Sequence, residues 1–122
     1  MRSDEGRGLL DAAASGGFHL PADTARRLGV ACDALVAGLR RAREQGTDLA
    51  AVQGFPDLAS GHALARGFEA KGAEYLALLA AFEETALRVK VGYLAAGQLI
   101  AQADAAQRAA LRAATEQLEG TR

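Results

Sequence analysis

Residues 60–119 read SGHALARGFEAKGAEYLALLAAFEETALRVKVGYLAAGQLIAQADAAQRAALRAATEQLE, and apolar or small side chains recur through them every seven residues. One series consists of Phe68, Tyr75, Phe82, Val89, Ala96, Ala103 and Ala110, and a second, four residues later, of Gly72, Leu79, Ala86, Tyr93 and Ile100. This repeat is typical of α-helices that pack side by side. We therefore predict one long helix over residues 60–119 with a continuous apolar seam. An isolated seam would leave aromatic rings in water, so it requires a facing surface from this chain or another.

A shorter amphipathic helix is predicted upstream, over residues 21–45. Pro21 suits the first helical position because its missing N–H would be unbonded there, and Asp23 complements the helix dipole. Apolar side chains then follow at three- and four-residue spacing, namely Leu28, Ala31, Cys32, Leu35, Leu39 and Ala42. The preceding residues 1–17 contain four glycines around a small apolar patch and are predicted to form a flexible N-terminal arm.

The connector between these helices, residues 46–59, is predicted to reverse the chain. It begins with Gly46 and contains a second breaker, the turn formed by Gly54, Phe55 and Pro56. The four residues 49–52 are too short for a helix of their own. We expect Phe55 to cover the end of the helix pair, with a ligand contact as the alternative. Residues 18–122 are therefore predicted to form one all-α domain, an antiparallel helical hairpin with a long second helix.

The two helices differ in length, which divides the seam. At ~1.5 Å per residue the first helix is ~38 Å long and the second ~90 Å, so the first is predicted to cover only residues 60–88 of the second. The predicted intramolecular seam consists of Leu28, Cys32, Leu35, Leu39, Leu64, Phe68, Tyr75, Leu79 and Phe82. Beyond it, Val89, Tyr93 and Ile100 are predicted to form a partner interface. Any bend is expected between Gly92 and Gly97.

Composition excludes several classes of protein. The 122 residues carry 14 basic and 15 acidic side chains, interspersed and giving a net charge of −1, which does not favour a nucleic-acid partner. The most apolar run, residues 75–82, is too short to span a bilayer, so no integral membrane segment is expected. The N-terminus lacks the apolar stretch of an ordinary signal peptide. The single Cys32 excludes an intramolecular disulfide and is expected to be a small buried core residue.

No constellation of catalytic or metal-binding residues is evident. The only histidines, His19 and His62, lie at predicted element boundaries, where surface or capping roles are expected. The adjacent acidic residues Glu83 and Glu84 point about a quarter-turn apart and are interpreted as part of a solvated helix face. We therefore predict no enzyme, no cofactor and no metal site.

The order of elements resembles a known family. The turn of residues 54–57, the run SGHALARGFEAKG over residues 60–72 and the later Tyr93-Leu94-Ala95-Ala96-Gly97, with Ile100 and Asp104, are similar to the small Trp-x-Gly helical hairpins of actinobacterial type VII secretion. The resemblance implies an antiparallel hairpin that dimerises into a four-helix bundle, with itself, a related chain or a secreted effector. Phe55 would replace the family's turn Trp, with Gly54 preceding rather than following it.

The same family carries an export signal, a Tyr with an acidic residue four positions later. Here Leu79 follows Tyr75 at that spacing and Gly97 follows Tyr93. The resemblance therefore implies a cytoplasmic targeting partner, chaperone or co-secreted substrate whose export signal is supplied by its helical partner. Two alternatives stay open: a homo-oligomeric coiled-coil structural protein, and a small-molecule carrier or enzyme using Tyr75, Tyr93 and His62 between helices.

Overall fold

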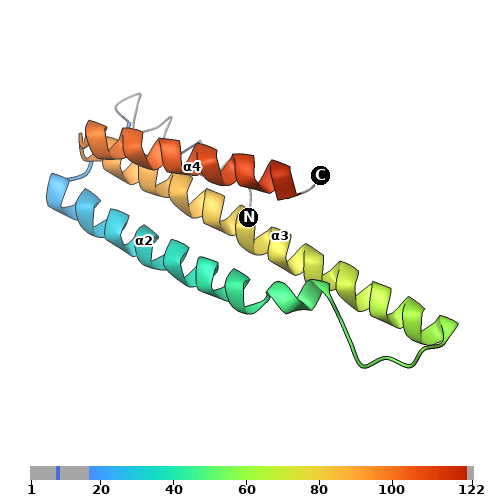
Figure 1. Ribbon diagram of the computed structural model, residues 1–122. Helices are drawn as coiled ribbons and strands as arrows, with labels where there is room; N and C mark the ends of the chain where they lie inside the picture. The colour runs from blue at the N-terminus through green and yellow to red at the C-terminus, as the bar shows by residue number, and fades with distance from the viewer. Residues whose placement is uncertain (1–7, 9–16, 121–122) are drawn as a thin grey trace.

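The computed structural model describes Gly8 and residues 17–120. Over this part of the chain the structure is helical and contains no β-strand (Figure 1). The elements are α2 (Ala22–Gln45), the 3₁₀ helix η1 (Thr47–Ala50), α3 (Ala59–Ala96) and α4 (Ile100–Gly120). The predicted all-α class is confirmed, and α2 matches the first predicted helix to within one residue. The predicted N-terminal arm, apart from Gly8 and Gly17, lies outside the described residues.

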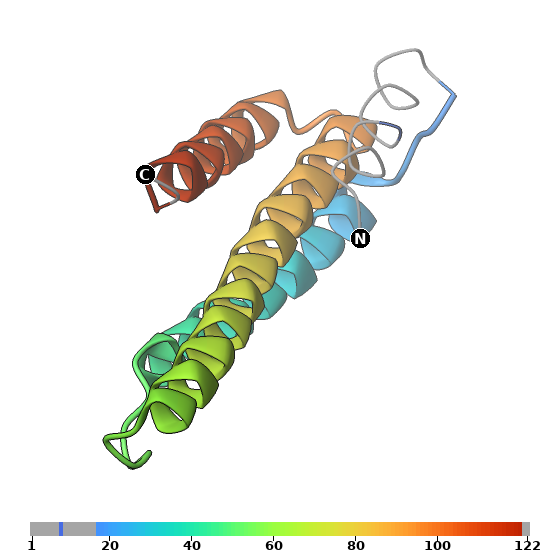
Figure 2. The same ribbon diagram turned by 90° about the vertical axis from the view of Figure 1, so that its right-hand side faces the viewer.

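Helix α3 is the centre of the fold, and α2 and α4 each run antiparallel along it. The two flanking helices pack on different sides of α3 and their backbones do not meet (Figure 2). One apolar cluster draws on all three helices, with Val36 from α2, Ala86 and Leu87 from α3, and Ala110 and Ala113 from α4. A second cluster joins Val91 and Leu94 of α3 to Ala103 and Ala106 of α4. Small residues on α4 thus bring it close to larger ones on α3.

The predicted second helix, residues 60–119, is two helices in the structure. Helix α3 ends at Ala96 and the chain reverses through three residues, at the Gly97 end of the region where a bend was expected. Gln98 takes a left-handed φ of 61°. The reversal lets the alanine-rich face of α4 bury against α3, whereas a straight helix would leave that face in water.

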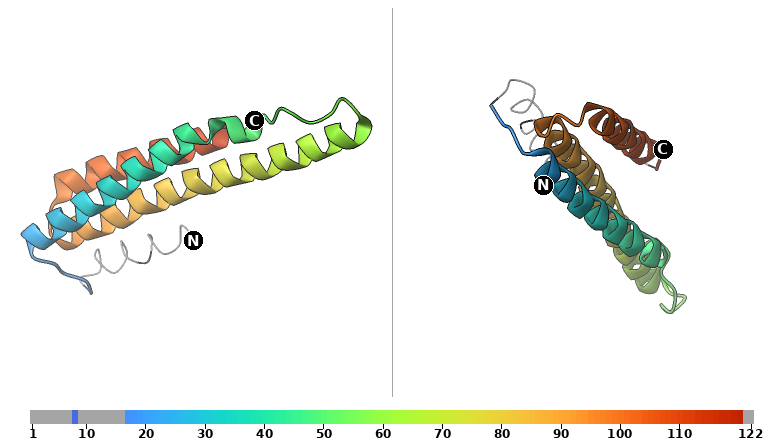
Figure 3. Two further views of the ribbon diagram at one scale, coloured as in Figure 1. Left: turned by 90° about the horizontal axis from the view of Figure 1, so that it is seen from below. Right: turned by 90° about the vertical axis from the view of Figure 1, so that its left-hand side faces the viewer.

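Residues 46–59 connect the antiparallel α2 and α3, as predicted, but by an extended course along α3. The connector does not reverse the chain at Gly46 but follows α3 toward its N-terminus, first as η1 and then as an extended segment (Figures 1 and 3). As a result α2 lies beside the C-terminal half of α3. Gly29 packs against Leu94, and the Leu20 N–H donates to the Ala96 carbonyl over 3.0 Å. The prediction that the first helix covers residues 60–88 is therefore wrong: the N-terminal part of α3 extends past the end of α2.

Candidate partner-binding surface

The backbone of the connector lies directly on α3, and glycines permit this contact. A Cβ atom at Gly72 would overlap the carbonyl group of Leu49, and one at Gly61 would overlap the carbonyl of Pro56. At both positions the two backbones are so close that only glycine, which has no Cβ atom, fits. The Val52 N–H also donates to the Glu69 carboxylate over 3.2 Å. These contacts hold the connector along one side of the protruding part of α3.

An adjacent side of the same part of α3 remains apolar and exposed. Leu64, Phe68, Tyr75 and Leu78 are 54%, 57%, 46% and 49% exposed. At 3.6 residues per turn their side chains lie within about 80° of one another around the helix axis. Leu58, at the end of the connector, is exposed as well. We call these five residues the tip surface.

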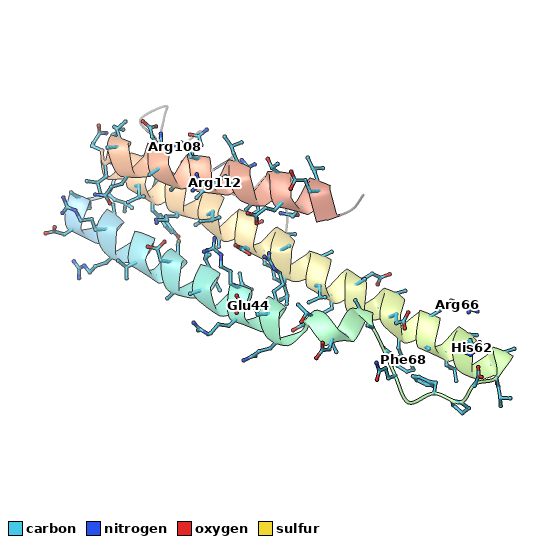
Figure 4. All side chains as sticks on the ribbon, in the orientation of Figure 1. Glu44, His62, Arg66, Phe68, Arg108 and Arg112 are labelled. Atoms are coloured by element: carbon cyan, nitrogen blue, oxygen red, sulfur yellow. The ribbon has the colours of Figure 1, made fainter. Side chains whose placement is uncertain are left out.

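Phe55 supports the tip surface from the connector. Its ring stacks on Phe68, with centroids 5.7 Å apart and an interplanar angle of 23°. Gly54, with φ of 94°, forms the preceding bend in a conformation that favours glycine. Phe68 lies on the connector side of the helix, whereas Arg66 points away from it (Figure 4). Phe55 was predicted to cover the end of the helix pair; instead it packs on α3 alone, because α2 ends at Gln45, before this level.

A buried polar cluster fixes the register of α2 on α3. The Glu83 carboxylate is 2% exposed and accepts hydrogen bonds from Arg40 Nε at 2.6 Å and Arg43 Nη1 at 2.7 Å. Lys90 Nζ pairs with Asp33 Oδ1 at 2.6 Å further along the same two helices. The interpretation of Glu83 as part of a solvated face is therefore wrong. A signal existed in the sequence, because Glu83 follows Leu79 by four residues and so falls on the buried side of α3.

The predicted intramolecular seam is buried only in part. Cys32 and Leu79 are buried, and Leu28, Leu39 and Phe82 are half-buried. Leu35, Leu64, Phe68 and Tyr75 are instead exposed, which corrects their assignment to the core. The last three lie beyond the end of α2. Of the second heptad series, Gly72, Leu79 and Ala86 are buried, and Gly72 lies against Leu49 of η1 rather than against α2.

The three residues of the predicted partner interface do not form one exposed surface. Val89 and Tyr93 are half-buried on α3, and Ile100 is exposed at the start of α4. Helix α2 reaches this region, because Ala25 lies against Gly97 and Gly29 against Leu94. The displaced connector explains both corrections. It shifts α2 toward the C-terminus of α3 and leaves the opposite end of α3 uncovered.

A groove of about 490 Å³ opens where the ends of α2 and α4 meet the middle of α3. Its floor is made largely of alanines, and its rim carries Glu44, Thr47 and Glu116. Tyr75, Tyr93 and His62, the polar groups of the predicted carrier site, do not line it. His62 instead pairs with Asp57 at 2.7 Å on the exposed tip. The groove therefore gives no support to a carrier site built on these three residues.

Cys32 faces α3 and is buried, as predicted. Burial, followed by the negative charge of Asp33, raises the pKa of its thiol, and the nearby Lys90 opposes this rise only in part. The thiol is therefore in its protonated, less nucleophilic form at neutral pH. Its role is that of a small apolar core residue.

Two further findings concern the described residues as a whole. Gly8 and residues 17–120 contain no group of three or more side chains placed to hold a metal ion. No helix in that part of the chain has both the length and the hydropathy required to span a membrane.

Comparison of the chain with protein-family models, curated proteins and solved structures finds no match.

Proposed function

We propose that the protein is a helical partner protein that binds an α-helix of another chain through the tip surface. The observation that carries the proposal is the protruding part of α3, where Leu64, Phe68, Tyr75 and Leu78 share one side of the helix and remain about half exposed. A cluster of exposed large apolar side chains on one side of a helix, here with Lys71 among them, marks a site of interaction. Side chains at i, i+4, i+11 and i+14 fit a second helix laid along the first.

The rim of the tip surface suits a helical partner with charged flanks. Lys71 and Glu74 lie among the apolar residues and pair with each other at 3.2 Å, both largely exposed. Each could exchange this weak contact for one with a partner, because exposed ion pairs contribute less than about 1 kcal/mol. Full burial of a large apolar side chain contributes ~1.5–3 kcal/mol, so completing the burial of four half-exposed ones would contribute roughly 3–6 kcal/mol before association costs.

The resemblance to type VII hairpins suggests which helix would bind. The partner would be a second copy, a related small helical protein or the helical domain of a secreted effector, and together they would form a four-helix bundle. In this role the protein acts in the cytoplasm as a targeting partner or chaperone, or leaves the cell together with its partner. The lack of an acidic residue four positions after Tyr75 or Tyr93 supports export on the partner's signal.

Co-expression with the product of an adjacent gene, followed by size-exclusion chromatography with light scattering, tests the proposal. Leu78→Asp and Phe68→Asp should weaken the complex at least tenfold and leave the circular dichroism of the protein unchanged. Leu111→Asp is the matched control, since Leu111 is 54% exposed on α4. A stable monomer that binds no helical partner, or equal effects of all three variants, would refute the proposal.

A further inference from the structure

The junction between α3 and α4 consists of only three residues and holds an unfavourable backbone conformation. The Gln98 N–H donates to the Ala95 carbonyl over 3.0 Å, and the Leu99 N–H donates to the Leu94 carbonyl over 2.9 Å. This pair of bonds defines a Schellman motif, in which the residue with left-handed φ is usually glycine. Here that residue is Gln98, with φ of 61°. A side chain in this region is disfavoured relative to glycine.

The start of α4 lacks the residues that stabilise a helix N-terminus. Leu99 precedes the helix and its carbonyl accepts the first intrahelical bond, from the Ala103 N–H, over 2.9 Å. Leucine has no side-chain acceptor for the free N–H groups of the first turn, and that turn contains no acidic residue. The residues at the junction therefore do little to favour the end of α3 and the start of α4. The reversal depends on the packing of α4.

Among the described residues, α4 packs mainly on α3, with Val36 of α2 joining one apolar cluster. The backbone of α4 approaches α3 and not α2. Its buried side is formed by Ala103, Ala106, Ala110 and Ala113, and Gln117 Nε2 donates to the Ala80 carbonyl of α3 over 3.2 Å. Among the described residues no ion pair joins α4 to another helix. Because Val36 of α2 stays beside its own α3, the α2–α3 pair of a second copy offers α4 an identical surface.

We propose that two copies of this chain exchange α4, forming a dimer in which the α4 helix of each copy packs on α3 of the other. The alanine contacts and the Gln117 hydrogen bond re-form between chains, so the interface itself is unchanged. Opening the junction frees Gln98 from its left-handed conformation in both copies. Short, strained hinges favour exchange of this kind, whereas association entropy opposes it, so the dimer forms at high protein concentration. The exchange uses a different surface from the tip surface and does not depend on the proposed function.

Cross-linking distinguishes an exchanged dimer from any other. In a Cys32→Ala background, Ala80→Cys and Gln117→Cys place two thiols on opposite walls of the groove, where a short bis-maleimide can join them. The dimer fraction, isolated by size-exclusion chromatography after refolding at high concentration, is cross-linked and analysed on a denaturing gel. Exchange predicts covalently linked dimers. Cross-links confined to single chains would overturn the proposal, even if the tip surface still mediates association, and so would a protein that stays monomeric at every concentration.

A hinge variant provides a second, independent readout. Gln98→Gly removes the penalty of the left-handed conformation, roughly fivefold per hinge, so the dimer dissociation constant should rise on the order of 25-fold for two hinges. Gln102→Gly is the control, because Gln102 is exposed within α4 and adopts helical angles in both forms. It should leave the monomer–dimer equilibrium unchanged. If Gln98→Gly and Gln102→Gly changed the dimer dissociation constant equally, strain at Gln98 would not drive the exchange of α4, and the proposed role of the hinge would be overturned.

Discussion

Removing the two arginines that contact Glu83 should destabilise the protein far more than removing Glu83 itself. Glu83 is 2% exposed, whereas the Arg40 and Arg43 side chains are 55% and 35% exposed. In Arg40→Ala/Arg43→Ala the carboxylate stays buried without a charged partner, a change that costs ~3–5 kcal/mol. In Glu83→Leu the arginines can turn to water, and an apolar side chain of similar size fills the site. We expect a cost within about 1.5 kcal/mol for that variant.

The single arginine variants refine the prediction. Arg40→Ala or Arg43→Ala each leaves one charged partner, so each should cost ~1–2 kcal/mol, and the double variant should exceed their sum. Arg41→Ala is the matched control. Arg41 lies exposed between the two on α2, and its removal should change the free energy of unfolding by less than about 0.5 kcal/mol.

Urea and thermal unfolding followed by circular dichroism measure these differences. For a chain of this length, a loss of 3–5 kcal/mol corresponds to a fall in Tm of roughly 12–20 °C. The opposite order, with Glu83→Leu more damaging than the double arginine variant, would refute the reasoning. It would mean that the cluster contributes net attraction rather than compensation for a buried charge.

Two further predictions concern glycine and cysteine. Gly72→Ala should destabilise the protein because the new methyl group would overlap the Leu49 carbonyl, whereas Gly67→Ala, on the same helix with open space around it, should raise the free energy of unfolding by ~1 kcal/mol. A Gly72→Ala variant as stable as Gly67→Ala would place the connector elsewhere. The raised pKa of the Cys32 thiol stabilises the fold below the ordinary thiol pKa and ceases to do so as the pH rises through the raised value. Wild type should therefore lose more stability than Cys32→Ala above about pH 8.5, and parallel pH profiles would contradict this.

The sequence allowed the helical regions to be predicted, but neither the break between α3 and α4 nor the side of α3 that each neighbour uses. Both heptad series run along the same helix, and the prediction gave the larger aromatic residues to the core. The structure buries the predicted Leu79, but it also buries Gly72 and Ala86, small residues that let neighbouring backbones approach closely. Phe68 and Tyr75, one step round the helix, are left outside. Heptad periodicity identifies the apolar side of a helix, but it does not say which of the two series of residues a neighbouring helix buries.

The course of the connector could not be predicted for a related reason. Its residues have no periodicity, so the sequence does not say whether the chain turns at Gly46 or continues along α3. The breaker at residues 54–56 was recognised. The connector reaches it along α3 because its backbone packs closely on Gly72 and Gly61 of that helix. Glycines on a predicted helix indicate close approach in general terms and do not name the segment that approaches.

The exposed tip surface follows from the register that the charged residues impose. Moving α2 toward the N-terminus of α3 would bring it alongside the tip surface and bury part of that apolar area. The same movement would take Arg40 and Arg43 away from Glu83 and Asp33 away from Lys90. Burying two leucine-sized side chains more fully contributes roughly 2–3 kcal/mol, whereas an unpaired buried carboxylate alone costs ~3–5 kcal/mol. The charges therefore hold α2 at one end of α3, and the apolar residues at the other end stay available for a partner.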